Sequence, residues 1–320
     1  MIRFNIVESI RARAVPGALA LAHGGREVTY AELMAQMGGL AERLRSCFPE
    51  ARRLRIGVQF PSGLDYVPVA LAVLAAGFCF VPVPDELAVT EKAELLERTA
   101  LDGLIMTEAA PHWLPATVEI VGRLKVNNIA ATVLKLSPPR PAFPVLAFEA
   151  LNPAFIRFSS GTTGKSKGVV LSHESLLERI RGANAGLGIG PQDRVLWVLP
   201  MAHHFAVSII LYLYHGATTI IDEQHLGEDL LKAVHAHAVT VMYGSPVHYR
   251  QLASAPGELD WPALRLAVAT AAALDQATAD KFRTRFGKPL VQGLGIIEVG
   301  LPLLNLEGAA EHPEAIGKPQ

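Results

Sequence analysis

Apolar and polar residues alternate in blocks along the chain, and most blocks have the spacing of a strand or of a helix. The stretch "LALAHGGREVTY" is apolar before Gly24 and Gly25 and more polar after them, which predicts a β-hairpin. Beyond it, Thr29 and Glu32 form a T-x-x-E capping box that predicts the start of a helix. That helix carries four apolar residues along one face: Leu33, Met37, Leu40 and Leu44.

The same alternation continues to the end of the chain. Buried strands are predicted in "RIGVQF", "FCFVPV", "GLIMT", "AFIRF", "GVVLS", "RVLWVL", "ATTIID", "VTVMYG", "LRLAVAT" and "PLVQG". Helices are predicted in "DYVPVALAVLAAG", over 92–100, from about 174, around "AVSIILYLYHG", up to 237 and over 275–286. Strands that alternate with helices indicate an α/β fold with mostly parallel sheets.

A proline-rich segment interrupts this pattern near the middle of the chain. "LSPPRPAFPV", at 136–145, has four prolines and is typical of a connector. We therefore predict one large domain over 1–320, built from two αβ-layered lobes. The first lobe covers about 1–140 and the second about 146–320.

Composition limits the class of protein. Half of the 320 residues are hydrophobic and 18% are charged, so the chain can bury a core, and its net charge of −1 gives no indication of nucleic acid or an anionic membrane surface. Two uncharged runs, 67–84 and 195–221, contain proline and glycine and are better explained as buried helix plus strand than as membrane spans. Cys47 and Cys79 are expected to be buried thiols, and with no secretion signal this predicts a cytoplasmic protein.

The stretch "FSSGTTGKSKGVVLSH", at 158–173, has the residues of an anion-binding loop. Glycines let the backbone turn and approach an anion closely, and successive N–H groups can form a concave nest for phosphate oxygens. A Walker-type phosphate loop does not fit, because Ser159 stands where that motif needs glycine and the following segment reads as a strand. A solvated surface loop is the other alternative.

At this point the chain resembles the adenylate-forming superfamily, which includes acyl- and aryl-CoA synthetases, luciferase-like enzymes and peptide-synthetase adenylation domains. The loop is similar to that family's [ST]-S-G-[ST]-[ST]-G-x-P-K-G signature, with Ser166 in place of the common proline. Further stretches resemble the family in the same order: "VALAVLAAGFCFVPV", "LPMAHHFAVS", "GSPVHYRQL", "AVATAAALDQATADKFRTRFGKPL", "QGLGIIEVG" and "AIGKP". The resemblance covers nearly the whole chain and implies the large N-terminal domain of the adenylate-forming fold, without the C-terminal lid domain.

The resemblance implies an acid–thiol ligase of the acyl-CoA synthetase type. Such an enzyme uses ATP and Mg²⁺ to convert a carboxylic acid into an acyl-adenylate, and CoA is its second substrate. The apolar stretch 205–213 suggests a hydrophobic acid, fatty or aromatic, and hence a role in fatty acid metabolism. Two alternatives stay open: loading of a carrier protein, or a non-catalytic nucleotide- or partner-binding domain.

The family resemblance also implies site residues. His203 would border the acid and the α-phosphate, although composition alone also fits a core histidine. Glu298 and Thr163 would lie near Mg²⁺, and Lys165 and Lys167 near the departing phosphates, although a solvated lysine pair is the alternative. Lys167 joins His203 and Glu298 as a candidate catalytic residue. The implied nucleotide contacts are Ser159, Ser160, Gly161, Thr162, Thr163, Gly164, Lys165, Lys167, Thr270, Ala271, Ala272, Gly293, Leu294, Gly295 and Ile297.

Besides Ser166, three features depart from the family pattern. Leu294 replaces an aromatic residue beside the adenine, and Ile297 replaces a threonine whose hydroxyl reaches the α-phosphate. Losing one such donor is expected to cost about 1–3 kcal/mol of transition-state stabilisation. The chain also ends at Gln320, before the family's ribose-binding aspartate, hinge and lid lysine. We therefore expect this chain alone to have little or no complete ligase activity.

Overall fold

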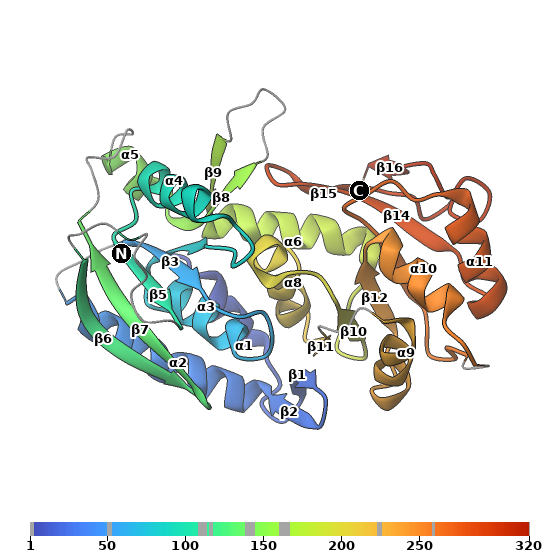
Figure 1. Ribbon diagram of the computed structural model, residues 1–320, viewed down its shortest axis with the longest axis horizontal. Helices are drawn as coiled ribbons and strands as arrows, with labels where there is room; N and C mark the ends of the chain where they lie inside the picture. Colours follow the sequence, from blue (N-terminus) through green and yellow to red (C-terminus); the bar gives the residue numbers. More distant parts are fainter. Residues whose placement is uncertain are drawn as a thin grey trace. The chain divides into compact units, whose positions relative to one another are not determined.

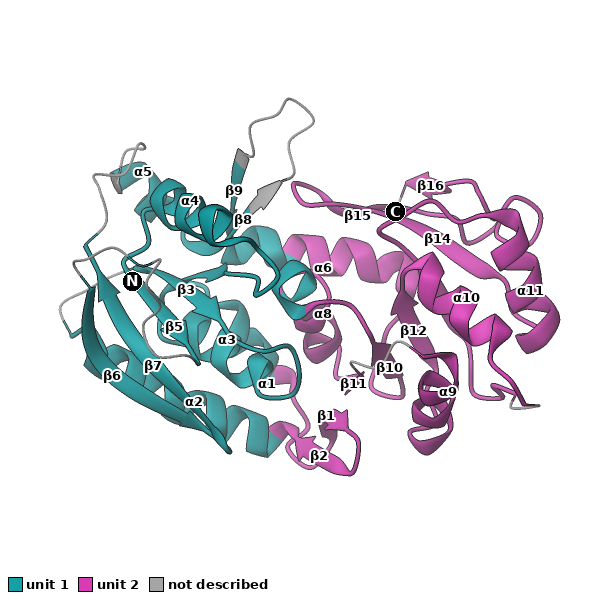
Figure 2. Cartoon of the chain, in the orientation of Figure 1, with its two compact units in different colours: residues 1–12, 31–177, 201–205 teal, residues 13–30, 178–200, 206–320 magenta. Residues whose placement is uncertain are grey.

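The computed structural model describes residues 3–49, 53–107, 114, 118–137, 145–159, 167–222, 226–257 and 260–319. Contacts between Cα atoms group the chain into two compact units, which are coloured separately in Figure 2. Unit 1 comprises 1–12, 31–177 and 201–205, and unit 2 comprises 13–30, 178–200 and 206–320. Each unit is built around its own sheet.

The sheet of unit 1 has seven strands in the order β6-β7-β5-β3-β4-β8-β9 (Figure 1). β3 pairs in parallel with β4 and β5, and β4 pairs in parallel with β8, whereas the outer pairs β5–β7, β6–β7 and β8–β9 are antiparallel. The strands are β3 (Arg55–Gln59), β4 (Cys79–Pro82), β5 (Gly103–Met106), β6 (Val118–Val126), β7 (Ile129–Leu136), β8 (Pro153–Ser159) and β9 (Lys167–Ser172). The accompanying helices are α1 (Ile6–Arg13), α2 (Tyr30–Cys47), α3 (Tyr66–Ala75), α4 (Val89–Thr99), α5 (Val145–Ala150), the start of α6 (His173–Leu187) and α7 (Met201–His204).

The central strands of unit 1 are covered on both faces. Every residue of β3 and β4 is buried, as expected for parallel strands between two layers of helices. In β4, Cys79 and Val81 pack in the cluster that includes side chains of α4 and α5. Phe80 points to the opposite face, where its ring stacks on Phe155 at 5.6 Å between centroids.

The sheet of unit 2 has nine strands in the order β16-β15-β14-β13-β12-β10-β11-β1-β2. The run from β1 to β14 is parallel throughout, and antiparallel strands close both edges. The strands are β1 (Leu19–His23), β2 (Arg26–Thr29), β10 (Arg194–Trp197), β11 (Thr218–Ile221), β12 (Val241–Gly244), β13 (Leu266–Ala269), β14 (Leu290–Ile296), β15 (Gly300–Leu304) and β16 (Lys318–Pro319). The helices are most of α6, then α8 (Ile209–Tyr214), α9 (Gly227–Ala236), α10 (Pro246–Ser254) and α11 (Gln276–Phe286).

Helices α9, α10 and α11 lie side by side along one face of this sheet (Figure 1). Their buried side chains form one cluster with residues of β10, β11, β12, β13 and β14. Phe282 of α11 lies at its centre, where its ring packs against Tyr249 at 5.3 Å and Phe286 at 4.8 Å. Helix α11 begins as its sequence predicts, because the Asp275 carboxylate caps it by accepting a hydrogen bond from the Thr278 amide.

Most predicted elements are confirmed. The hairpin turns at Gly24 and Gly25, and the four apolar residues of the following helix are all buried. The sequence did not predict α1, β6, β7, α5, α7, α10, β15 or β16. It expected both cysteines to be buried, and this is wrong for Cys47, which is only partly buried near the end of α2. Among the described helices, none is both long enough and apolar enough to cross a membrane.

The two units do not divide at the proline-rich segment. Residues up to 177 stay with unit 1, because β8 pairs with β4 through Phe80 and Phe155. Residues 13–30 belong to unit 2, because β1 pairs with β11 through Leu21 and Thr219. The chain therefore enters each unit more than once, which differs from the predicted lobes 1–140 and 146–320.

Candidate functional site

The candidate phosphate loop joins two paired strands. β8 and β9 are antiparallel, with Phe158 opposite Gly168 and Ser159 opposite Lys167, so the segment after the loop is a strand as predicted. This strand–loop–strand arrangement differs from the strand–loop–helix arrangement of a Walker-type site. Several predicted contacts lie outside the described residues: Ser160, Gly161, Thr162, Thr163, Gly164 and Lys165, together with the side chains of Ser159 and Lys167.

His203 belongs to a polar cluster in unit 1. It is the last residue of α7, and its Nε2 lies 2.9 Å from Oε1 of Glu86, in the segment after β4. Arg157, in β8, donates a hydrogen bond to the His203 carbonyl oxygen, and its Nη2 lies 3.4 Å from Nδ1 of the ring. Because a guanidinium can only donate, these contacts favour the neutral tautomer with its proton on Nε2, donated to Glu86.

The cluster distinguishes His203 from its neighbour His204. The side chain of His203 is 33% exposed and that of Glu86 is 55% exposed, so both can be reached from solvent. Burial, helped by the charge of Arg157, lowers the pKa of His204 to about 3, so His204 is neutral near pH 7. Both histidines are half-buried, and the contact of His203 with the exposed carboxylate of Glu86 disfavours its interpretation as a core histidine.

The segment that carries Glu86 is fixed by its preceding residue, Asp85. Gln59 donates to the Asp85 carboxylate at 2.9 Å, and Lys92 of α4 donates to its carbonyl oxygen, also at 2.9 Å. These two bonds hold the chain just after β4, where Glu86 meets His203. The position of the His203 ring therefore depends on residues from three separate stretches of unit 1.

A second group of predicted residues lies at one end of the sheet of unit 2. Thr270–Ala272 follow β13 directly, and its parallel neighbour β14 continues through Gly293–Ile296. The buried Thr270 amide donates to the carbonyl oxygen of Gly244, at the end of β12, at 2.9 Å. β12 and β13 thus end in register, beside the point where β14 continues toward β15. The carboxyl ends of parallel strands are where open α/β sheets usually bind ligands.

The predicted adenine-contacting segments differ in exposure. Ala271 has a φ of +68°, in the left-handed region, and both it and Ala272 are exposed. Gly293 is buried, and a Cβ there would lie 3.1–3.2 Å from side chains of β13 and β15, so this glycine permits close packing. Leu294 and Ile297 are half-buried, whereas Gly295 is exposed. The exposed members are therefore the ones available to a nucleotide.

Glu298 lies in the turn between β14 and β15. The turn is closed by a 3.1 Å hydrogen bond from the Val299 amide to the Ile296 carbonyl oxygen, and Gly300 adopts a φ of +104°. The Glu298 side chain is exposed and makes no hydrogen bond or ion pair with other described residues. An unpaired carboxylate of this kind fits a ligand of Mg²⁺.

The described residues contain no group of three or more His, Cys, Asp or Glu side chains that could hold a metal ion. A cation at Glu298 would therefore depend on ligands such as phosphate oxygens and water, which is the usual situation for Mg²⁺ at phosphate-binding sites. The predicted second metal contact, Thr163, lies outside the described residues.

Three residues that the sequence analysis missed contact the candidate site residues. Arg157 and Glu86 contact His203, and Arg179 of α6 donates to Ile296 in the turn that carries Glu298. Arg157 could have been found, because a single charged residue in the apolar strand "AFIRF" is unusual. No local pattern marks Glu86 or Arg179.

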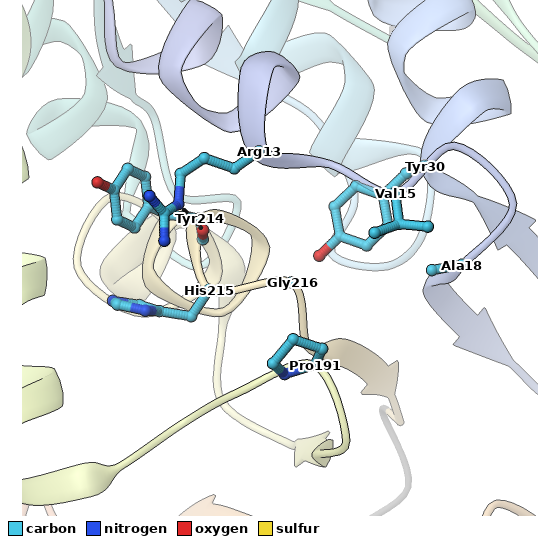
Figure 3. A pocket seen from close by; sticks show the side chains of 8 residues that line it. All are labelled: Arg13, Val15, Ala18, Tyr30, Pro191, Tyr214, His215 and Gly216. Atoms are coloured by element: carbon cyan, nitrogen blue, oxygen red, sulfur yellow. Dashed lines mark hydrogen bonds between the residues drawn. The ribbon is translucent and has the colours of Figure 1, made fainter.

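Unit 2 also contains a cavity of about 290 Å³ that involves none of the predicted residues (Figure 3). The guanidinium of Arg13 lies over the Tyr214 ring at 4.6 Å, and its Nε donates to the Tyr214 carbonyl oxygen at 3.2 Å. The Tyr30 hydroxyl lies 2.9 Å from the Ala217 carbonyl oxygen. These contacts attach 13–30 to the end of α8. The complete lining is Arg13, Val15, Ala18, Tyr30, Pro191, Tyr214, His215 and Gly216.

Comparison with protein families matches the family described as AMP-binding enzyme to residues 9–320 of this chain. Among curated proteins, feruloyl-CoA synthase from an Amycolatopsis species is 29% identical over 317 residues. The match covers 97% of this chain and 62% of that protein, so the chain spans less than two thirds of the relative's length.

Solved structures share the fold. ATP-bound MatB from Rhodopseudomonas palustris has a TM-score of 0.74 at 19% identity, over 94% of this chain and 61% of MatB. The inhibitor-bound N-terminal domain of FACL13 from Mycobacterium tuberculosis has a TM-score of 0.79 at 21% identity, over 98% of this chain and 82% of that chain. These likenesses confirm the predicted α/β architecture of a large N-terminal domain.

Proposed function

Because the chain belongs to the family of AMP-binding enzymes, we propose that it binds ATP and activates a carboxylic acid as an acyl-adenylate, for transfer to CoA. This is the activity of an acid–thiol ligase. The observation that carries the proposal is that Thr270–Ala272 follow β13 at the point where its neighbour β14 continues through Gly293–Ile296 to the exposed carboxylate of Glu298. This arrangement supports a site for a nucleotide and its metal ion.

The chemistry explains why positive charge is needed. The acid's carboxylate must attack the α-phosphorus while pyrophosphate leaves, so two anions have to approach each other. At about 3.5 Å and an effective dielectric constant of ~20, two unit charges repel by about 4–5 kcal/mol. Mg²⁺, when bound, would offset part of this repulsion, and we assign its protein ligands to Glu298 and Thr163. Lys165 and Lys167 are proposed to neutralise the departing phosphates.

His203 is proposed to border the acid. Because Glu86 accepts the proton on Nε2 and Arg157 faces Nδ1, the imidazole is held from both sides within unit 1. A ring fixed in this way can present one face to a ligand without losing its own hydrogen bonds. Its role is therefore proposed to be orientation of the acid, with no covalent step.

The class of acid is proposed from the relative and not from the apolar stretch 205–213. Phe205 and the side chains of α8 are fully buried, and Phe205 packs against Tyr66 and Phe80, so this stretch fills the cores of the units. The relative's name, feruloyl-CoA synthase, supports a hydrophobic aromatic acid instead. Because these side chains are buried in the cores, the stretch 205–213 is no longer an argument for a hydrophobic acid, fatty or aromatic.

The first test is isothermal titration of this chain with ATP in the presence and absence of Mg²⁺. Binding that requires Mg²⁺ and weakens in Glu298→Gln would support the proposal, whereas no binding would favour a non-catalytic domain. Pyrophosphate exchange with a panel of aromatic and fatty acids then tests acid activation. Incubation with CoA or with a carrier protein, followed by product analysis, identifies the acceptor.

A further inference from the structure

Arg179 is a cation in an unusual environment. It lies on α6 in unit 2, and its Nε and Nη1 atoms are buried and have no hydrogen-bond partner among the described residues. It forms no ion pair with a described carboxylate, although Glu298 is near enough to act on it through space. Buried polar groups without partners are rare in folded proteins, so this arginine needs an explanation.

Among the described residues, its side-chain hydrogen bond goes to the turn that presents Glu298. Nη2 donates to the Ile296 carbonyl oxygen at 3.1 Å, the same oxygen that closes the turn by accepting from Val299. At the other end of the turn, a Cβ on Gly300 would come within 3.3 Å of Nε and 3.5 Å of the Arg179 Cβ. Arg179 therefore supports both ends of a turn whose exposed middle residue is Glu298.

The charge of Arg179 acts on the same carboxylate. Burial lowers the pKa of Arg179 to about 10, and the opposing effect of Glu298 raises it, so the guanidinium stays protonated at neutral pH. A fixed positive charge beneath the turn attracts the Glu298 carboxylate, and it repels a bare divalent cation. A cation that arrives with phosphate groups brings negative charge with it and is not disfavoured in this way.

We propose that Arg179 is a positioning residue that holds the Ile296–Gly300 turn in place and thereby sets the magnesium requirement of nucleotide binding at Glu298. The proposal rests on the proposed function, because it assumes that Glu298 serves a metal–nucleotide complex. Arg179 itself is not expected to touch the ligand, since its two unpartnered nitrogen atoms are buried.

The test compares Arg179→Met, Arg179→Lys and a matched control, Arg181→Met. Arg181 lies on the same helix but is exposed and contacts Tyr214, so its replacement changes the charge equally without touching the turn. Hydrogen exchange of a peptide spanning 294–303 measures the turn in the ligand-free protein. The Mg²⁺ concentration for half-maximal ATP binding measures the link to the site.

Arg179→Met loses one charge-assisted hydrogen bond, which is expected to speed hydrogen exchange of the turn amides by about tenfold. The Mg²⁺ concentration for half-maximal ATP binding is expected to rise by a similar factor. Arg181→Met should match the unmodified protein, and Arg179→Lys, which keeps the charge but loses the planar donor group, should fall between them. If Arg179→Met is poorly folded, Arg179→Lys alone still has to show both changes.

Unchanged exchange, or faster exchange with an unchanged Mg²⁺ requirement, would overturn the assignment. If the unmodified protein binds no ATP, the proposed function fails. In that event, unchanged hydrogen exchange of the turn amides in Arg179→Met would also show that Arg179 does not hold the turn in place. Faster exchange in Arg179→Met would show that Arg179 holds the turn, but the proposed link to the Mg²⁺ requirement would still be overturned.

Discussion

Replacing Asp193 by asparagine should strongly destabilise unit 2. Asp193 is buried immediately before β10, and each of its carboxylate oxygens accepts two hydrogen bonds. Nε and Nη2 of Arg265 donate at 2.8 and 2.7 Å, the Gly190 amide at 2.9 Å and the Thr240 hydroxyl at 2.8 Å. An asparagine amide would place hydrogen atoms against at least one of these donors and remove the charge that pairs with Arg265.

The size of the effect follows from burial. Breaking a buried ion pair by removing one charge typically costs about 3–5 kcal/mol, because the remaining charge is left uncompensated. Here the Arg265 side chain is 41% exposed and that of Asp193 is 8% exposed, so water can compensate part of the loss. We therefore expect Asp193→Asn to lower the free energy of unfolding of unit 2 by about 2–4 kcal/mol.

Urea unfolding followed by tryptophan fluorescence is a suitable assay, because Trp197 and Trp261 are both buried in unit 2. A matched control is Asp280→Asn on α11, where the carboxylate pairs with Arg283 at 3.0 Å and both side chains are nearly half exposed. That exposed pair should contribute no more than about 1 kcal/mol. Equal losses in the two variants would show that the Asp193 network does not stabilise the fold in the way its geometry indicates.

Three further predictions test other parts of the molecule. Gly300→Ala should strain a turn with φ of +104° by about 1–3 kcal/mol and weaken Mg²⁺-dependent ATP binding, as titration calorimetry can measure. Glu86→Ala should weaken binding of a non-hydrolysable acyl-adenylate by about tenfold, because the His203 ring loses its partner, while Glu86→Gln should retain most of the affinity. Burial lowers the pKa of His173 to about 4, and its neutral Nδ1 accepts from the Ile6 amide at 3.3 Å. The His173 imidazole therefore becomes protonated near pH 6.5 in the unfolded chain but only near pH 4 in the folded chain, so the free energy of unfolding should fall as pH decreases across that range. Measured by unfolding at several pH values, the dependence of this free energy on pH should be weaker in His173→Asn.

The elements that sequence reasoning found are those whose pattern is strong and local. Helix α3 is apolar on all sides and β4 is continuously apolar, which indicates that both are buried. The glycine at 77 marks the boundary between the two elements. The β6–β7 hairpin was missed because β6 is largely exposed, with charged residues such as Glu119 and Lys125 between its apolar ones. It also breaks the strand–helix alternation on which the analysis relied, since β7 pairs antiparallel with β5.

The candidate site was predictable only where one stretch carries all of its residues. Thr270–Ala272 follow the recognisable strand β13, Gly293–Ile296 complete its neighbour β14, and the parallel pairing of the two strands brings these segments together. Glu86 contacts a histidine 117 residues further along the chain, and Arg179 contacts a turn 117 residues after it. No hydrophobic spacing encodes such pairs, because each is fixed by how the sheets and helices of its unit pack.

The resemblance to the family implies a threonine at the position of Ile297, and Arg179 contacts the same turn. Ile297 is half-buried and offers no donor, so within the described turn Ile296–Gly300 the only ionisable side chain is that of Glu298. A turn with one acidic side chain and no hydroxyl group must rely on cations to receive a phosphate. Arg179 places one fixed positive charge at that turn, through its hydrogen bond to the Ile296 carbonyl oxygen, and a metal ion held by Glu298 would supply further positive charge. If the proposed function holds, a site without a hydroxyl donor at 297 is expected to depend more on charge, and so on ionic strength and on magnesium, than a site that keeps the hydroxyl.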